Sequence, residues 1–443
     1  MPGIAGIYRQ GKKDLVDRML GALAHRGGAG KKIHETATAT IGMVQHPSQA
    51  DDTSDNIVRD AGGPERKAEA SCKPDGITLS RDELGVAPLY YGFTGNGDLA
   101  FASEVKALLP ATTRIFEVLP GHRLINNVPV SYFRPEKKTP AENDPARMAE
   151  RLRTMVEEAV KDSIPDSDTG AWLSGGLDSS IISALLIKHV PHLHTFVAGV
   201  KGAPDLDYAR EAAAFIGARH HEVVVSLEEI MKVLPDVIFH LESFDALLVR
   251  SSILNYLAAR EAMNYVTEVF SGEVADELFA GYDYLSSLHG HPLEDELIDI
   301  TGQLHNTALQ RVDRCASAHG LIPHVVFADR RVVTCALQIP VRYKLYDGTG
   351  KWILRKAMEG LVPDTVLWRP KAKFWQGGGI AEILADHASQ RITDFDFNRG
   401  KRLPNGWQIR SKEELMYYRL FHQHFGVCEN LEWMGRTKIP DTT

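Results

Sequence analysis

The residues with the clearest chemical potential form the stretch Ser174-Gly175-Gly176-Leu177-Asp178-Ser179-Ser180. Apolar runs precede and follow it, a pattern typical of a strand, a tight turn and the start of a helix. Two adjacent glycines let a ligand approach the backbone closely, because no Cβ stands in the way. The free N–H groups of the helix start and the neighbouring hydroxyls would bind an anion such as phosphate. Asp178 adds a carboxylate for Mg²⁺, which would offset the phosphate charge.

The glycine stretch differs from the Walker pattern, which needs Gly-Lys-Ser/Thr after four spacer residues. It resembles instead the pyrophosphate loop of ATP pyrophosphatases, enzymes that cleave ATP to AMP and pyrophosphate. The alternative interpretation is a structural glycine-rich turn, but the full motif between a strand and a helix favours a nucleotide site.

Two further stretches offer charged groups. Ser271-Gly272-Glu273-Val274-Ala275-Asp276-Glu277 again indicates a strand end, a small turn and a helix start, so Asp276 could join Asp178 on a metal ion. The alternative is an acidic helix N-terminus stabilised by the macrodipole. Later, residues 351–358 and 367–374 supply lysines and arginines that would suit a pyrophosphate and a developing oxyanion. Solvated surface lysines are the alternative there.

The composition narrows the class of protein. A chain of 443 residues with 44% hydrophobic and 24% charged residues predicts a globular protein of two or three domains. The formal net charge of −8 argues against a nucleic-acid partner, and no apolar run is long enough to span a membrane. The four cysteines form no CxxC pair, so we expect neither zinc nor disulfides, and a cytoplasmic location fits best.

The elements around these motifs fall into two patterns. The first part of the chain reads as β-rich, with a polar loop over residues 48–75, and a polar linker follows at 135–146. Beyond it strands and helices alternate, which predicts a parallel sheet with helices on both faces and a ligand at the carboxyl ends of the strands. The strands are expected at 193–200, 220–225 and 267–271, and the helices at 205–216, 227–241 and 250–262.

Together and in order, these stretches resemble the glutamine-dependent asparagine synthetase family, which has relatives that close β-lactams or lasso peptides. The resemblance extends to Gly3-Ile4-Ala5-Gly6-Ile7, His25-Arg26-Gly27 and Pro88-Leu89-Tyr90-Tyr91. It implies a two-domain α/β protein. Residues 1–134 would form a degenerate glutaminase domain of the β-rich Ntn-hydrolase-like type. Residues 135–146 would be a linker, and residues 147–443 an ATP-pyrophosphatase domain of the HUP-like type.

The first domain departs from the family pattern. The family uses an N-terminal cysteine as its glutaminase nucleophile, but Pro2 stands there, and proline cannot form a thioester. The glutamine-binding stretch is also absent, and the polar loop takes its place. We therefore expect a shortened, inactive glutaminase-like domain. The nitrogen would come from ammonia, another amine or an amine supplied by a partner.

The resemblance implies ATP and Mg²⁺ as cofactors, and it assigns roles residue by residue. Glu273 would act as base or proton relay toward the amine, and Lys371 would stabilise the acyl-adenylate and the oxyanion. Asp178 and Asp276 would bind Mg²⁺, and Lys351 would bind pyrophosphate. The remaining nucleotide contacts are assigned to Trp172, Ser174, Gly175, Gly176, Ser179, Ala198, Ser271 and Gly272.

The residues expected at the acyl-substrate pocket depart from the family pattern. Asp205 and Arg250 are expected to bind this substrate, but Leu247 and Leu248 replace two threonines of the aspartate-using enzymes. The substrate is therefore either aspartate or a larger, more apolar carboxylic acid, which ATP would activate for attack by ammonia or another amine. Two alternatives are intramolecular closure of a lactam or macrolactam and a non-catalytic partner of an amidotransferase. A homodimer is one expected form of the protein.

Overall fold

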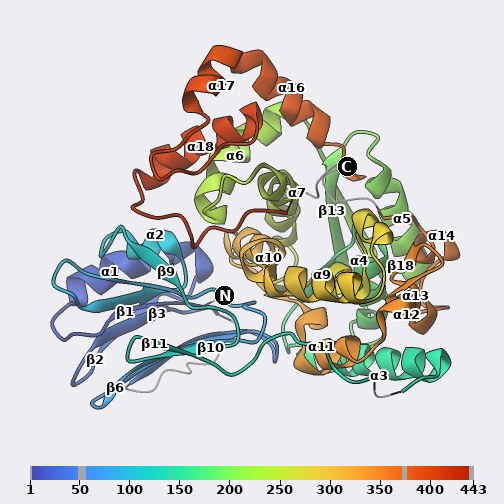
Figure 1. Cartoon of the computed structure of the whole chain (residues 1–443), viewed down its shortest axis with the longest axis horizontal. Coiled ribbons are helices and arrows are strands. Elements are labelled where there is room, and N and C mark those ends of the chain that lie inside the picture. Colours follow the sequence, from blue (N-terminus) through green and yellow to red (C-terminus); the bar gives the residue numbers. More distant parts are fainter. Residues whose placement is uncertain (1, 48–55, 141, 372–376, 439–443) are drawn as a thin grey trace.

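The first part of the chain builds two antiparallel sheets (Figure 1). The computed structural model describes residues 2–47, 56–140, 142–371 and 377–438. The first sheet has the strand order β2 (Lys31–Glu35), β3 (Thr40–Val44), β1 (Gly3–Ile7), β8 (Leu99–Ala102), β7 (Tyr90–Phe93) and β9 (Ile115–Glu117). The second has the order β11 (Val128–Ser131), β10 (His122–Ile125), β6 (Gly76–Arg81), β5 (Lys67–Lys73) and β4 (Ile57–Ala61).

The core of this part holds the two sheets together. Buried side chains from both, such as Ile4 and Phe101 from the first and Leu79 from the second, belong to one apolar cluster. Helices α1 (Lys13–Gly21) and α2 (Val105–Leu108) pack against the first sheet. The β-rich α+β architecture expected for this part is therefore confirmed.

The predicted loop at 48–75 is wrong over residues 57–61 and 67–73. Strands β4 and β5 lie there, while residues 48–55 of that prediction lie outside the described residues. Along β5 the buried residues alternate with more exposed ones: Ala68, Ala70 and Cys72 are buried, whereas Lys67 and Lys73 are exposed. This is a strand period, but small residues carry it, and the surrounding Lys, Glu and Asp made the segment read as a polar loop.

A five-stranded parallel sheet forms the centre of the second part, which confirms the predicted α/β fold. Its order is β14 (Arg219–Val225), β13 (His194–Val200), β12 (Thr169–Trp172), β15 (Glu268–Phe270) and β16 (Ile322–His324), with every neighbouring pair parallel. Successive side chains of a strand point to opposite faces. Accordingly Phe196 of β13 joins the apolar cluster of α6 (Leu227–Leu241) and α7 (Ala246–Ala262), while Val197 joins that of α4 (Leu177–Leu186) and α5 (Pro204–Ile216).

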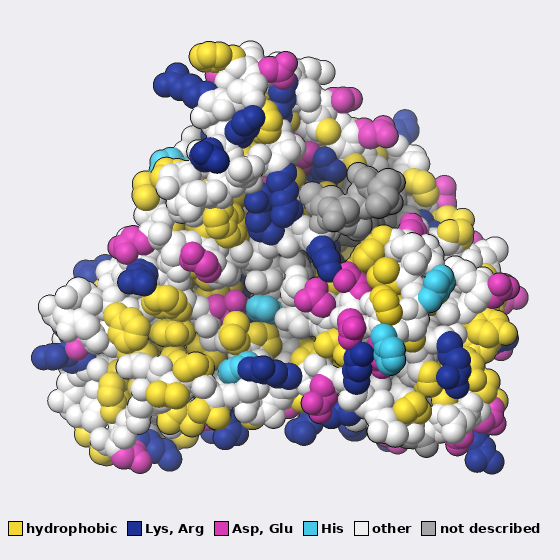
Figure 2. Space-filling view, in the orientation of Figure 1, with side chains coloured by type: hydrophobic (Ala, Val, Ile, Leu, Met, Phe, Trp, Pro, Cys, Tyr) yellow, Lys and Arg dark blue, Asp and Glu magenta, His cyan; other side chains and the backbone are white. Residues whose placement is uncertain are grey.

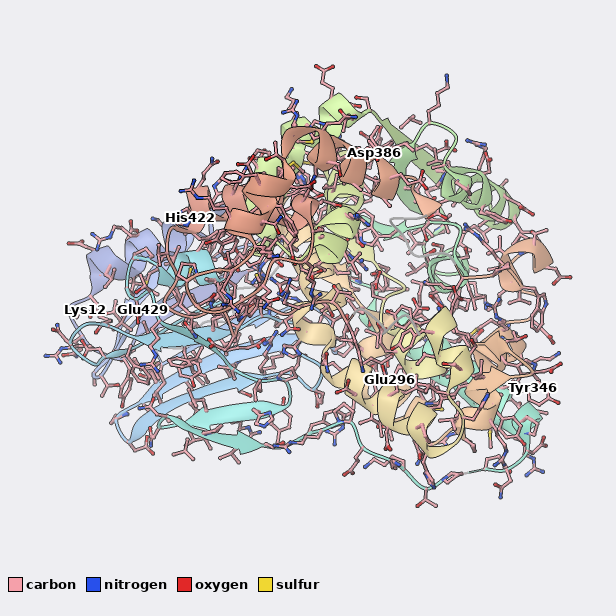
Figure 3. All side chains as sticks on the ribbon, turned by 45° about the horizontal axis from the view of Figure 1, so that its top comes forward. Lys12, Glu296, Tyr346, Asp386, His422 and Glu429 are labelled. Atoms are coloured by element: carbon pink, nitrogen blue, oxygen red, sulfur yellow. The ribbon has the colours of Figure 1, made fainter. Side chains whose placement is uncertain are left out.

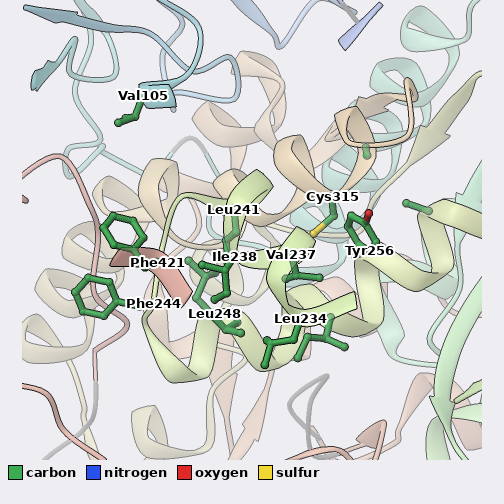
Figure 4. Packing of buried hydrophobic residues seen from close by; sticks show 14 of the residues in the cluster. Val105, Leu234, Val237, Ile238, Leu241, Phe244, Leu248, Tyr256, Cys315 and Phe421 are labelled. Atoms are coloured by element: carbon green, nitrogen blue, oxygen red, sulfur yellow. The ribbon is translucent and has the colours of Figure 1, made fainter. Parts of the chain in front are cut away.

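Helix α7 begins four residues before its predicted start. Asp245 caps it, because its side chain accepts a hydrogen bond from the N–H of Leu248 at 2.9 Å. Leu248 then packs with Leu241, Phe244 and Phe421 in the cluster shown in Figure 4. The chain after residue 290 is mainly helical, as expected. It contains α9 (His291–Gly302), α10 (Ala308–Ser317), α11 (Arg330–Leu337), α12 (Val341–Lys344), α13 (Trp352–Ala357), α14 (Asp364–Leu367), α16 (Ala381–Arg391), α17 (Asp394–Gly400) and α18 (Lys412–Phe425).

Buried charges join the two parts. Arg26 donates to both carboxylate oxygens of Asp313 on α10, at 3.0 and 3.1 Å, and it also donates to Asp60 on β4 at 3.2 Å. Arg66 donates to Asp313 at 2.9 Å, and Arg314 donates to Asp313 at 2.7 Å. All of these side chains are almost fully buried, so the contact between the two parts rests on internally compensated ion pairs. Within the described ranges, no helix has the length and apolarity needed to cross a membrane.

Candidate functional site

Two loops meet at the carboxyl edge of the parallel sheet. The glycine stretch follows β12, and Ser271-Gly272 follows the neighbouring strand β15. A Cβ on Gly272 would lie 2.6 Å from the backbone nitrogen of Ser179, so only glycine allows this approach. Gly175 has a φ of +67° and lies against the backbone of α5, which also favours glycine. The two motifs found in the sequence therefore form one site, at the edge where parallel sheets bind ligands.

A cavity of about 430 Å³ opens between these loops. Its lining includes most residues predicted to bind nucleotide, substrate or metal: Trp172, Ser174, Gly176, Asp178, Ser179, Asp205, Ser271, Gly272, Glu273, Asp276, Lys351 and Lys371. Ala198 is not among these lining residues; it is fully buried in β13. Gly175 is also outside the lining, although its carbonyl accepts a hydrogen bond from Arg369 at 3.1 Å.

Lys351 lies between the two aspartates predicted to bind metal. Its Nζ is 2.5 Å from Asp178 Oδ2 and 2.6 Å from Asp276 Oδ1. Lys371 Nζ donates to the other oxygen, Asp276 Oδ2, at 2.6 Å. Burial by itself would raise the pKa of Asp276, but the two ammonium groups outweigh it and hold this pKa below its ordinary value. Burial by itself would lower the pKa of Lys371, but the charge of Asp276 raises it, so Lys371 stays protonated at neutral pH.

The aspartates also suit a magnesium ion. Among the described residues, Asp178 Oδ1 is buried without a hydrogen-bond partner. Carboxylate oxygens are ligands that Mg²⁺ prefers, usually together with phosphate oxygens and water. A buried, unpaired carboxylate oxygen beside a phosphate-type loop therefore fits this ion, and the metal role of Asp178 and Asp276 stays a prediction.

Glu273 has a partner that the sequence motifs did not reveal. Its carboxylate forms an ion pair with the largely buried guanidinium of Arg311, which projects from α10. Arg311 lines the cavity, so it is a functional candidate that sequence reasoning missed. Its signal in the sequence is weak, because one arginine in an amphipathic helix most often lies on a solvated face.

The loop that ends with Lys371 is fixed by arginines. Arg369 donates to Asp205 Oδ1 at 2.7 Å and stacks 3.9 Å above the ring of Tyr208. Arg355 donates to the carbonyls of Gly350 and Arg369, at 3.0 and 3.2 Å. These contacts connect α5, the glycine stretch and the lysine loop. Residues 372–374 of the predicted cationic stretch lie outside the described residues.

Several residues close to the first cavity have strained backbone conformations. Val274, Ala280 and Lys351 have φ angles of 81°, 59° and 56°, in the left-handed region that non-glycine residues seldom adopt. The first two flank the short helix α8 (Ala275–Phe279), and the third precedes α13. Such conformations persist where the surrounding structure holds them, often at functional sites.

A second cavity of about 180 Å³ adjoins the first. Both are lined by Glu273, Asp276, Tyr282, Arg311 and Lys371. Leu247 and Leu248, which the sequence placed at the acyl substrate, line this second cavity. Arg250 lines neither cavity; its Nε donates to Glu413 Oε1 at 2.8 Å, and a second short contact completes a bidentate pair. The structure thus brings the two leucines to the site, whereas Arg250 of α7 is paired with Glu413 of α18 and lines neither cavity.

Figure 2 shows lysine and arginine side chains close to aspartate and glutamate side chains in the central part of this face of the molecule. The parallel sheet, the glycine loop and the paired lysines and carboxylates are the parts of an enzyme that uses ATP to form carbon–nitrogen bonds. Comparison with known families gives the same class. The model of the family "Asparagine synthase" matches residues 151–298 and 288–432, and that of "Glutamine amidotransferase domain" matches residues 71–134.

The chain belongs to the asparagine synthase family of ATP-dependent carbon–nitrogen ligases, which confirms the family resemblance. It is 34% identical over 378 residues to asparagine synthetase B [glutamine-hydrolyzing] of Escherichia coli, covering 79% of this chain and 68% of the relative. It is 32% identical over 397 residues to asparagine synthetase [glutamine-hydrolyzing] of Gallus gallus, covering 79% and 70%. A probable asparagine synthetase of Schizosaccharomyces pombe is 33% identical over 393 residues, with the same two coverages.

Proposed function

We propose that this protein is an AMP-forming amide ligase that adenylates a small carboxylic acid and then amidates it without hydrolysing glutamine. The observation that carries the proposal is the convergence of Lys351 and Lys371 on Asp276 beside the glycine stretch. Two ammonium groups at this point suit both the pyrophosphate that leaves ATP and the charge that develops on the acyl group.

The first step forms a mixed anhydride. A carboxylate oxygen of the substrate attacks the α-phosphorus of ATP, the bond to the bridging oxygen breaks, and pyrophosphate leaves with the electron pair. We assign the binding of phosphate oxygens to Lys351 and to the hydroxyls of Ser174 and Ser179, which line the first cavity. Asp178 and Asp276 would hold Mg²⁺, which offsets phosphate charge when bound.

The second step transfers the acyl group. The nitrogen of ammonia or another amine attacks the acyl carbon, a proton leaves the nitrogen, and AMP departs with the electrons of the broken anhydride bond. Glu273 is the base that we assign to this proton, and its pairing with Arg311 keeps the carboxylate oriented on the cavity wall. Lys371 stabilises the oxyanion. Both residues line the two adjoining cavities, so activation and amidation share one wall.

Residues 1–134, which we propose as the first domain, lack the means to supply ammonia from glutamine. Pro2 carries no thiol, and its buried carbonyl accepts a hydrogen bond from Arg26 at 3.1 Å. Asp60, on the strand that replaces part of the expected glutamine-binding stretch, contacts the same arginine. A buried, ion-paired environment around residue 2 supports a structural role for this domain and an external nitrogen source.

The test is a product assay with ATP, Mg²⁺, ammonium and a panel of carboxylic acids, starting with aspartate. We expect AMP and pyrophosphate in equal amounts, each dependent on the acid. The Asp276→Asn variant should lose both products, whereas Asp283→Asn, on the rim of the same cavity, is the matched control. ADP as the sole nucleotide product would overturn the proposal.

A further inference from the structure

The second cavity has the composition of an acyl-binding chamber. It shares Glu273, Arg311 and Lys371 with the nucleotide cavity, so a ligand inside it has access to the groups that we assign to amide formation. On the remaining sides it extends between α7, α9 and α10, away from the glycine stretch. An acid with its carboxylate at the shared wall would therefore have the rest of its carbon skeleton in this chamber.

One side of the chamber is hydrocarbon. Leu247 and Leu248 come from the first turn of α7, and Ile300 comes from the last turn of α9. Leu248 is 4% exposed and packs into the core. A carboxylate or amide placed against this wall would lose its hydration without gaining a hydrogen bond from it, which costs several kcal/mol. These three side chains therefore favour a hydrocarbon chain of the ligand. The lining also contains the polar residues Ser251, Gln303 and Thr307, and the cations Arg436 and Lys438, which are already paired with Glu414 and Glu296.

Glu277 also lines the chamber and has a carboxylate oxygen that pairs with none of the described residues. Glu277 is 5% exposed and accepts a hydrogen bond from the hydroxyl of Tyr282 through Oε1. Its other oxygen, Oε2, is buried and has no hydrogen-bond partner in the part of the chain that the structure describes. A cationic or hydroxyl donor from a ligand would satisfy Oε2.

The C-terminal segment Arg436–Lys438 forms the outer wall. The N–H and hydroxyl of Thr437 donate to Asp245, the cap of α7, at 3.1 and 2.8 Å. Lys438 forms an ion pair with Glu296 on α9 at 2.7 Å, and Figure 3 labels this glutamate. The segment thus joins the helices that carry Leu247 and Ile300 and forms one wall of the chamber.

From these contacts we infer that the second cavity binds the acyl substrate, and that this substrate is a small amino acid with a hydrocarbon side chain rather than a diacid. The inference rests on the proposed function and names its substrate class. The side chain lies against Leu247, Leu248 and Ile300, the amino group faces Glu277, and the carboxylate faces Lys371.

The experiment compares three probes, 2-aminohexanoate, hexanoate and aspartate, by pyrophosphate release with ATP, Mg²⁺ and ammonium. We expect kcat/KM for 2-aminohexanoate to exceed that for aspartate and for hexanoate by about tenfold or more. Leu247→Thr should lower kcat/KM for 2-aminohexanoate about tenfold. It should therefore reduce the ratio of kcat/KM for 2-aminohexanoate to that for aspartate. Leu227→Thr, on α6 and outside the cavity lining, is the matched control and should leave the order of the probes unchanged. Preference for aspartate, or an order that Leu247→Thr does not alter, would overturn the inference while leaving the ligase function intact.

A binding measurement separates the two proposals. If no probe releases pyrophosphate, isothermal titration of the full chain with 2-aminohexanoate decides about the chamber alone. Binding that Leu247→Trp abolishes and Leu227→Trp preserves supports the chamber and counts against the ligase reaction. Absence of binding, or binding that Leu247→Trp leaves unchanged, contradicts the chamber.

Discussion

Arg26 and Asp313 are 287 positions apart in the chain, yet they form a buried bidentate ion pair with N–O distances of 3.0 and 3.1 Å. The pair joins the antiparallel sheets to α10, the helix that also carries Arg311. Burial alone would raise the pKa of Asp313, but the charges of Arg26 and Arg66 reverse this and lower it. The ionised form is therefore part of the folded contact between the two parts.

Arg26→Met should destabilise the folded protein by about 3–5 kcal/mol, because it leaves buried carboxylates with too little compensating charge. The measurement is the free energy of unfolding from urea titration, followed by fluorescence. Arg9→Met is the matched control: Arg9 pairs with Asp98 from a side chain that is 60% exposed, so its loss should cost less than about 1 kcal/mol. Equal effects of the two substitutions would contradict this account.

The raised pKa of His324 predicts that the free energy of unfolding decreases at mildly alkaline pH. Burial alone would lower the pKa of His324, but hydrogen bonding with Glu268 at 2.6 Å and the nearby Glu65 raise it to about 9. A histidine with a raised folded-state pKa contributes stability that is complete below the unfolded value of about 6.5. This contribution is lost as the pH rises through about 9. The free energy of unfolding should fall by up to roughly 3 kcal/mol between pH 6 and pH 9.5.

The control for this pH profile is a histidine that stays neutral. Burial lowers the pKa of His46 to about 4, so the stability contribution of His46 changes with pH only up to about pH 8, where the unfolded histidine is also neutral, and His46→Gln should leave the slope above about pH 8 unchanged. His324→Gln should flatten the curve over that range. If the free energy of unfolding of His324→Gln still decreased with pH as in the unchanged protein, the pH dependence would belong to another group.

The sequence predicted four of the five strands of the parallel sheet from short runs rich in β-forming residues, and its helices from their clear period. It missed β16, which has three residues and lies in the mainly helical part of the chain. The glycine stretch and Ser271-Gly272 were located for a related reason: each is a local motif whose backbone performs the function. Two other features depend on contacts between distant segments. Arg311 reaches Glu273 only because α10 packs beside β16, and Arg250 is paired with Glu413, which is 163 positions away. No local pattern encodes either pairing, and β5 escaped prediction because alanines carry its buried face.

Glu273→Gln should separate the two chemical steps. The substitution keeps the size of the side chain but removes the base, so amide formation should fall by about 10²–10⁴-fold. Adenylation does not need this base, so exchange of labelled pyrophosphate into ATP should continue in the presence of the acid. Loss of exchange equal to the loss of amide would remove Glu273 from the role of base.

Lys371→Ala should abolish amide formation while ATP still binds. The lysine faces Asp276 on the wall shared by both cavities, and removing a charge that stabilises an oxyanion costs about 10²–10³-fold in kcat. ATP affinity, measured by equilibrium dialysis, should change little because Lys351 and the glycine stretch remain. Lys356→Ala removes a lysine paired with Glu359 at the surface, and this control should behave like the unchanged protein. Normal turnover by Lys371→Ala would exclude the role.

Glutamine should not replace ammonium as the nitrogen donor, and Pro2→Cys should not create glutaminase activity. A thiol at position 2 would lie beside Arg26, whose guanidinium already binds the carbonyl of residue 2 together with Asp60 and Asp313. These groups are fully or almost fully buried, so glutamine has no vacant partner for its own charges there. The measurement is the release of glutamate from glutamine, detected by coupled oxidation of the glutamate. Ammonium-dependent release of AMP checks that each variant is folded. Glutaminase activity in Pro2→Cys would mean that the missing thiol at residue 2 is the sole cause of the inactivity of the domain. Glutaminase activity in the unchanged chain would show that the domain is active.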